Sequence, residues 1–224
     1  MKTYYFIHNT LLTTIRIFYI LKNIILLFYK LNTMKNGIEK YVEEIANIIM
    51  AAQLNYEIWW IYKEQNNRNR FVDTLNVYHI FFFNSIHAHF GAMIIALYKL
   101  FETRKDTVNI PKLIDLIENE ESISAIEIIR FKDEINKIKP SWKKICIIRN
   151  NLFAHKTDNF DQDDIFKIAN VAPNEFKEII DKSINLINGI TYILDEPIYV
   201  FNISASQDTI RLLNDLKQLN EKNS

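Results

Sequence analysis

The segment Ile147–Lys156 places an arginine, an amide and a histidine at the end of a strongly apolar stretch. From Ile135 to Thr157 the chain carries no acidic residue and six basic ones, which are Lys137, Lys139, Lys143, Lys144, Arg149 and Lys156. The whole chain has 27 basic and 27 acidic residues, so this positive charge is a local feature of a neutral protein. A local basic cluster around such side chains suggests a phosphate-bearing partner.

The spacing within this segment limits how Arg149 and His155 can act together. The apolar positions three and four residues apart should face the core, and they are Ile145, Ile148 and Leu152. Arg149 lies beside that stripe, and a straight helix would place His155, six residues later, about 120° away from it. The two side chains can converge on one phosphate only if the helix ends or bends near Ala154, or if a second copy of the chain supplies the partner residue.

Other interpretations of the polar and aromatic residues stay open. Arg149 could pair with Asp158 or Asp161, and His155 could cap the C-terminus of its helix. His87 and His89 are two residues apart, so their side chains point apart on a helix and no metal site is expected. Two aromatic groups could stack on bases, but their helical register favours a core or a dimer interface; they are Trp59-Trp60 and Phe81-Phe82-Phe83.

Cysteine usage excludes two classes of site. Cys146 is the only cysteine, so the chain has neither an internal disulfide nor a cysteine-based zinc site. Cys146 lies among isoleucines, and we expect a buried, inert thiol. The absence of a cysteine framework fits a reducing compartment, and we predict a cytoplasmic protein that needs no cofactor or metal.

The elements that position this segment are predicted to be helices. Among 224 residues, 49% are hydrophobic and only three are glycine and four proline, a composition that favours long helices. Apolar periodicity predicts an all-α bundle of about five to seven helices. The expected helices cover residues 38–63 (ended by the polar run 64–70), 71–102, 111–120, 122–139 (stopped by Pro140), 140–154, 173–194 and 206–220. Residues 198–203 read as an isolated extended stretch.

The sequence predicts three parts: an extension at residues 1–33, a helical domain at 34–197, and an extended segment with a last helix at 198–224. The extension is apolar, basic and free of acidic residues. Arg16 and Lys22 interrupt its apolar runs, so no stable membrane span is expected. It could lie upstream of a true start at Met34, form an additional packed or interfacial helix, or act as an anchor.

The motif Arg149-Asn150-Asn151-Leu152-Phe153-Ala154-His155 resembles the Arg-x5-His signature of the HEPN superfamily (higher eukaryotes and prokaryotes nucleotide-binding). Further segments resemble its abortive-infection, AbiU-like branch, and these are Tyr56–Trp59, Tyr78–Phe83, Ile94–Phe101 and Val108–Leu113. The resemblance covers residues 35–194. It implies a HEPN-like up-and-down helical bundle.

The resemblance also implies a function, namely a metal-independent RNA endonuclease that leaves 2′,3′-cyclic phosphate and 5′-hydroxyl ends. His155 would act as general acid or base, Arg149 would hold the scissile phosphate, and Asn150 would orient either of them. Three lysines would follow the RNA backbone, and they are Lys143, Lys144 and Lys156.

Partners are implied in the same way. A toxin or anti-phage effector of this kind would be a homodimer whose two motifs share a basic cleft, controlled by an antitoxin or another defence-system protein. Some related toxins carry a modifiable tyrosine two residues after the histidine, where this chain has Thr157. The alternatives are a non-catalytic RNA or nucleotide binder and a helical protein-interaction module.

Overall fold

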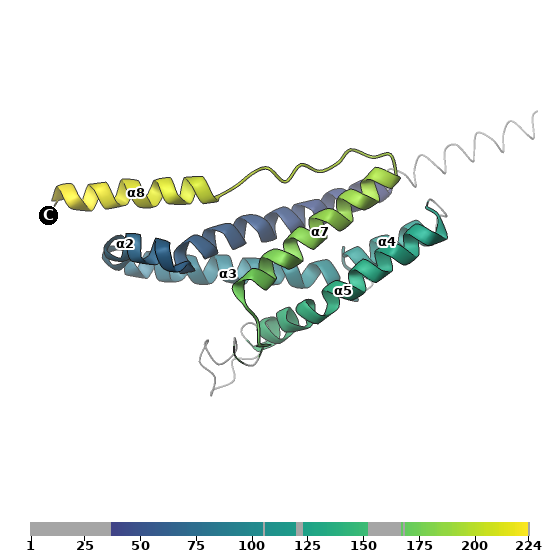
Figure 1. The fold of residues 1–224 in the computed structure, drawn as a ribbon, viewed down its shortest axis with the longest axis horizontal. Coiled ribbons are helices and arrows are strands. Elements are labelled where there is room, and N and C mark those ends of the chain that lie inside the picture. The colour runs from purple at the N-terminus through teal and green to yellow at the C-terminus, as the bar shows by residue number, and fades with distance from the viewer. Residues whose placement is uncertain (1–36, 105, 120–122, 152–166, 168, 224) are drawn as a thin grey trace, which may run out of the picture. The chain divides into compact units, whose positions relative to one another are not determined.

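The computed structural model describes residues 37–104, 106–119, 123–151, 167 and 169–223. The chain divides into two compact units, residues 1–40 and 41–224, and all described residues except 37–40 belong to the second. The described residues contain helices and no strand, which confirms the all-α prediction. The first described helix covers residues 37–63, and the others are α2 (Gln65–Val77), α3 (His79–Phe101), α4 (Ile110–Asn119), α5 (Ala125–Arg149), α7 (Pro173–Ile193) and α8 (Ser206–Asn223) (Figure 1).

The predicted break after the first helix is confined to one residue. Glu64 ends that helix and caps the next, because its carboxylate accepts hydrogen bonds from the backbone N–H groups of Asn66 and Asn67. The polar run that we expected to form a connection is therefore the first part of α2.

The predicted helix 71–102 is two helices. Tyr78 leaves the helical conformation, with φ −108° and ψ 36°, and separates α2 from α3. No proline or glycine marks this position. The break lets α2 pack against α8, where the Tyr78 hydroxyl lies 3.3 Å from Asn220 Oδ1. Tertiary packing thus sets a helix boundary that the apolar periodicity of the sequence does not indicate.

Helix α3 is the central helix, since it contacts α2, α4, α5 and α7. Most of its large apolar side chains are buried, and these include Phe82, Phe90, Met93, Ile94, Leu97, Leu100 and Phe101. Phe83, by contrast, is 63% exposed. The length and apolar composition of α3 would also suit a membrane span, as those of a buried core helix often do.

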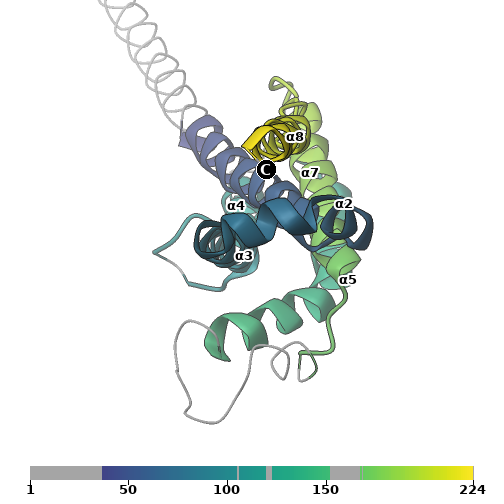
Figure 2. The same ribbon diagram turned by 90° about the vertical axis from the view of Figure 1, so that its left-hand side faces the viewer.

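Helix α5 lies along one side of α3 and α4 (Figures 1 and 2). The prediction that Pro140 stops a helix is wrong, because α5 continues through this residue without interruption for 25 residues. Proline inside a helix removes one backbone hydrogen bond and costs about 3 kcal/mol. Buried isoleucines on both sides of Pro140 offset that cost against the neighbouring helices, and they are Ile135, Ile138, Ile145 and Ile148.

The last helices lie where the sequence places them. Helix α7 begins at Pro173 as predicted, and α8 begins at Ser206. The segment between them pairs with no strand within the described residues. Asn188 of α7 instead bonds the backbone of Tyr199 twice, donating to its carbonyl and accepting from its N–H. One amide side chain therefore supplies the bonds that a neighbouring strand would have made.

Candidate functional site at the end of α5

The described site residues on α5 do not all lie on one side of the helix. At about 100° per residue, Trp142 and Arg149 are seven positions apart and share one line along the helix. Lys143 and Asn150 form the adjacent line for the same reason. Lys144 falls about 160° from Trp142 around the helix axis, on another side of the helix. The basic cluster seen in the sequence is therefore divided between two faces.

Arg149 is half-buried and held by two contacts. Its guanidinium lies over the Tyr98 ring, 4.8 Å from the ring centroid, and its Nη1 donates to Asn150 Oδ1 over 3.0 Å. Within the described residues it pairs with no carboxylate. Two neighbouring residues of the predicted site thus interact directly, and the bond uses the Asn150 amide oxygen rather than its N–H donors.

Tyr98 is itself fixed by α5. Its backbone carbonyl accepts a hydrogen bond from Trp142 Nε1 over 3.1 Å, and the two rings stack with centroids 6.0 Å apart. Trp142, Tyr98 and Arg149 are therefore linked by consecutive contacts between α3 and α5. Sequence reasoning did not identify Tyr98 or Trp142 as site residues. The seven-residue spacing from Trp142 to Arg149 is the one local signal that could have pointed to the tryptophan.

The regular α-helix ends at Arg149. Asn150 and Asn151 continue it as a π-helical turn, a feature often found at functional sites. Asn151 Nδ2 also donates to the Ile147 carbonyl over 2.7 Å. His155 and Lys156 lie outside the described residues, as do Thr157 and the acidic residues 158–164.

The two predicted lysines of α5 have different surroundings. Lys143 is exposed and forms no ion pair with any described residue. Lys144 Nζ lies 2.6 Å from Glu175 Oε1, with the two side chains only 28% and 19% exposed. Burial opposes ionisation of Glu175, but hydrogen bonds from Lys144 and from the Ala172 backbone N–H outweigh it and lower the carboxyl pKa. Lys144 thus connects α5 to the start of α7, and its charge is compensated there.

Cys146 lies between the two lines of site residues. Burial raises the pKa of its thiol to about 11, so the thiol is protonated at neutral pH. Cys146 is half-buried rather than fully buried as we expected, and a protonated thiol fits the expected lack of reactivity.

Most of the histidine and aromatic residues that could have bound a metal or a base pack within the helical bundle instead. His89 Nδ1 lies 2.8 Å from Asn55 Oδ1, and burial lowers the pKa of the imidazole, so this residue joins α3 to the first helix as a neutral side chain. Trp59 is buried against Phe90 and Phe176, with ring centroids 5.4 and 5.7 Å away. Phe81, by contrast, is 60% exposed.

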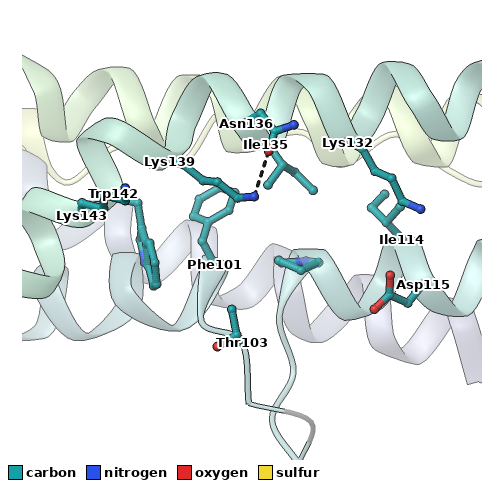
Figure 3. Close-up of a pocket in the computed structure, with 11 residues that line it drawn as sticks. Phe101, Thr103, Ile114, Asp115, Lys132, Ile135, Asn136, Lys139, Trp142 and Lys143 are labelled. Carbon is teal, nitrogen blue, oxygen red and sulfur yellow. Dashed lines mark hydrogen bonds between the residues drawn. The ribbon is translucent and has the colours of Figure 1, made fainter.

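A cavity of about 500 Å³ lies beside this site, between the end of α3, α4 and α5 (Figure 3). Trp142 belongs to both features, because it lines the cavity and also stacks on Tyr98. The cavity has an apolar lining formed mainly by Phe101, Pro111, Ile114, Ile135 and Trp142. The sequence did not predict it, since its walls come from three separate helices.

A family model of HEPN proteins, described as AbiU2, matches residues 35–210 of this chain. No curated protein and no solved structure matches it.

Proposed function

The chain belongs to the AbiU2 family of abortive-infection HEPN proteins, and on this premise we propose that it is a metal-independent RNA endonuclease centred on Arg149. The observation that carries the proposal is the way in which this arginine is held. Stacking on Tyr98 and the bond to Asn150 fix the guanidinium at a helix end. No described carboxylate competes for it.

Arg149 is suited to a scissile phosphate. A guanidinium presents N–H groups in a fixed fork that matches two phosphate oxygens, and it can stabilise the charge that develops as the phosphodiester reacts. Asn150 accepts one bond from the guanidinium, so its own N–H groups are available to orient the phosphate or the imidazole of His155.

The proposed reaction uses the 2′-hydroxyl of the RNA as the nucleophile. The 2′-hydroxyl loses its proton to a base, and the 2′ oxygen bonds to phosphorus as the bond from phosphorus to the 5′ oxygen breaks. The 5′ oxygen takes up a proton from an acid. His155 serves as the base, with water as the acid, or as the acid, with water as the base. The products are a 2′,3′-cyclic phosphate and a 5′-hydroxyl end. An imidazole can serve in either proton transfer because it titrates near neutral pH.

Lysine side chains on the same face would extend the contact with RNA. Lys143 keeps its predicted role, and Lys139 joins it as a second lysine with no acidic partner among the described residues. Lys156 stays a prediction. Lys144 would reach RNA only by leaving Glu175, so its contribution should be small. We further propose a cytoplasmic homodimer, with an antitoxin or defence-system protein as partner.

The test is cleavage of total RNA by the purified full chain in EDTA, with the new ends identified chemically. Wild-type protein should produce 5′-hydroxyl ends, and Arg149→Ala and His155→Ala should not. Arg130→Ala is the matched control, because it removes an exposed arginine from the same helix and should cleave like wild type. Cleavage that requires a metal ion, or that survives both site substitutions, would overturn the proposal. Salt-sensitive RNA binding without cleavage would identify a non-catalytic binder instead.

A further inference from the structure

The cavity beside the site has the size and lining of a ligand site. Its volume of about 500 Å³ is within the range of small-molecule sites, roughly 300–1,000 Å³. Phe101, Ile114 and Ile135 of its wall are themselves buried, so the apolar surface belongs to the packed core and is preformed. The cavity wall therefore has the apolar character that would contact the face of a flat aromatic ring.

Trp142 provides an aromatic surface at one end of this cavity. Figure 3 shows Trp142 and Lys143 at that end, with Lys132, Ile114 and Asp115 at the other. The hydrogen bond from Trp142 Nε1 to the Tyr98 carbonyl fixes the ring. Base–aromatic stacking tolerates any base, because every base has a π-face.

The charges around the cavity favour a phosphate at the Trp142 end. Lys139 donates to Asn136 Oδ1 over 2.8 Å, and neither Lys139 nor Lys143 pairs with a described carboxylate. At the opposite end, Lys132 is neutralised by Glu118 at 2.5 Å, and Asp115 adds a negative charge. An anion is therefore attracted beside the tryptophan and repelled at the far end.

Arg149 adds a further positive charge on α5, beyond the Trp142 end of the cavity. Trp142 and Arg149 are seven residues apart on one line, which is about 10 Å along the helix axis. Both contact Tyr98. A single strand of RNA can span this distance, so one strand can contact the cavity and the arginine together.

We propose that this cavity receives one unstacked nucleobase, stacked against Trp142, with the adjoining phosphate held by Lys139 and Lys143. The inference rests on the proposed function, because it places the base on the strand whose scissile phosphate lies at Arg149. It predicts that the substrate is unpaired RNA, since a base within a duplex cannot leave its stack without an energetic cost. A free nucleotide carries the same base and phosphate groups. The experiment therefore distinguishes an RNA strand from a free nucleotide as the ligand.

The test compares binding of single-stranded and duplex RNA of one sequence by the full chain in EDTA, on a His155→Ala background. Thr103→Trp fills the mouth of the cavity from an exposed loop position. The double variant Lys139→Ala/Lys143→Ala removes the proposed phosphate contacts. Lys137→Ala is the matched control, because this exposed lysine of α5 lies on another face and does not line the cavity.

Both cavity variants should weaken single-strand binding about tenfold and abolish the preference over duplex, while Lys137→Ala should stay within about twofold of its parent. Mononucleotides should quench the tryptophan fluorescence of the protein at millimolar concentration only, and Trp142→Phe should remove this quenching. Quenching at micromolar concentration would assign the cavity to a free nucleotide. Unchanged RNA binding in both cavity variants, with no quenching by nucleotides, would overturn the inference.

The two proposals fail in different ways. If wild-type protein does not cleave RNA but Thr103→Trp still weakens single-strand binding, the nuclease assignment is lost and the base site stands. If wild-type protein cleaves and both cavity variants on the His155→Ala background bind single strands as tightly as their parent, the base site is lost and the nuclease assignment stands.

Discussion

At the scale of single residues, Arg149 depends on geometry as much as on charge. The guanidinium both stacks on Tyr98 and donates to Asn150, and a planar, delocalised group is needed to do both. A lysine would keep the positive charge but would lose the stack and the fork of donors. One conservative substitution, Arg149→Lys, can therefore separate the effect of the positive charge from the effect of the guanidinium geometry.

We expect Arg149→Lys to lower kcat for RNA cleavage by roughly 10²–10³-fold, the range found when one donor to a developing anion is lost. RNA affinity should change far less, because the charge that attracts phosphate is kept. Single-turnover cleavage and equilibrium binding, measured on the same RNA, give the two values. A kcat close to that of wild type would mean that Arg149 acts only as a positive charge.

At the scale of secondary-structure elements, one carboxylate holds α8. Glu57 Oε2 of the first helix accepts hydrogen bonds from Ser204 Oγ, at 2.7 Å, and from the backbone N–H groups of Ala205 and Ser206 at the start of α8. Burial opposes ionisation of Glu57, but these bonds and one from Gln53 outweigh it and lower the carboxyl pKa. The first helix thereby supplies the N-cap of the last.

The lowered pKa of Glu57 predicts the pH dependence of this contact. The stabilisation is present above the ordinary glutamate pKa of 4.5 and is lost as pH falls through the lower folded-state value. Glu57→Gln should destabilise α8 by about 1 kcal/mol at neutral pH, as loss of a cap does. Faster amide hydrogen exchange confined to residues 206–223 would show this. Glu43→Gln, at an exposed position of the same helix, should leave exchange unchanged.

Pro140 sets a second expectation at this scale. It lies inside α5, where its missing N–H leaves one helical carbonyl without its usual donor, and it is exposed to solvent. Pro140→Ala should restore the bond and raise the free energy of unfolding by about 1–3 kcal/mol. Thermal and denaturant unfolding measure this change. A lower stability would mean that the packing of α5 against α3 requires a bend imposed by the proline.

At the scale of the whole molecule, charge distribution matters more than net charge. The chain is neutral overall, yet Arg149, Lys139 and Lys143 gather on one face of α5 without a described acidic partner. If these three contact phosphates, log K for single-stranded RNA should fall with log salt with a slope of about −2 per chain. Titrations at several salt concentrations measure the slope. Removing Lys143 should make it shallower by about 0.7, whereas a flat dependence would argue against a phosphate-binding face.

The sequence by itself determined the all-α class, the approximate extent of α4, α7 and α8, and the placement of Arg149 beside a buried stripe. These are local properties, because a 3.6-residue period records which face of a helix is buried. Tertiary structure alone decided the break at Tyr78, the continuity of α5 through Pro140 and the pairing of Lys144 with Glu175. It also decided that Tyr98 of α3 meets Trp142 and Arg149 of α5 beside a cavity. Each of these features depends on contacts between helices that are distant in the chain. The energies of such contacts outweigh the local conformational preferences of the residues, and the contacts produce no periodic pattern in the sequence.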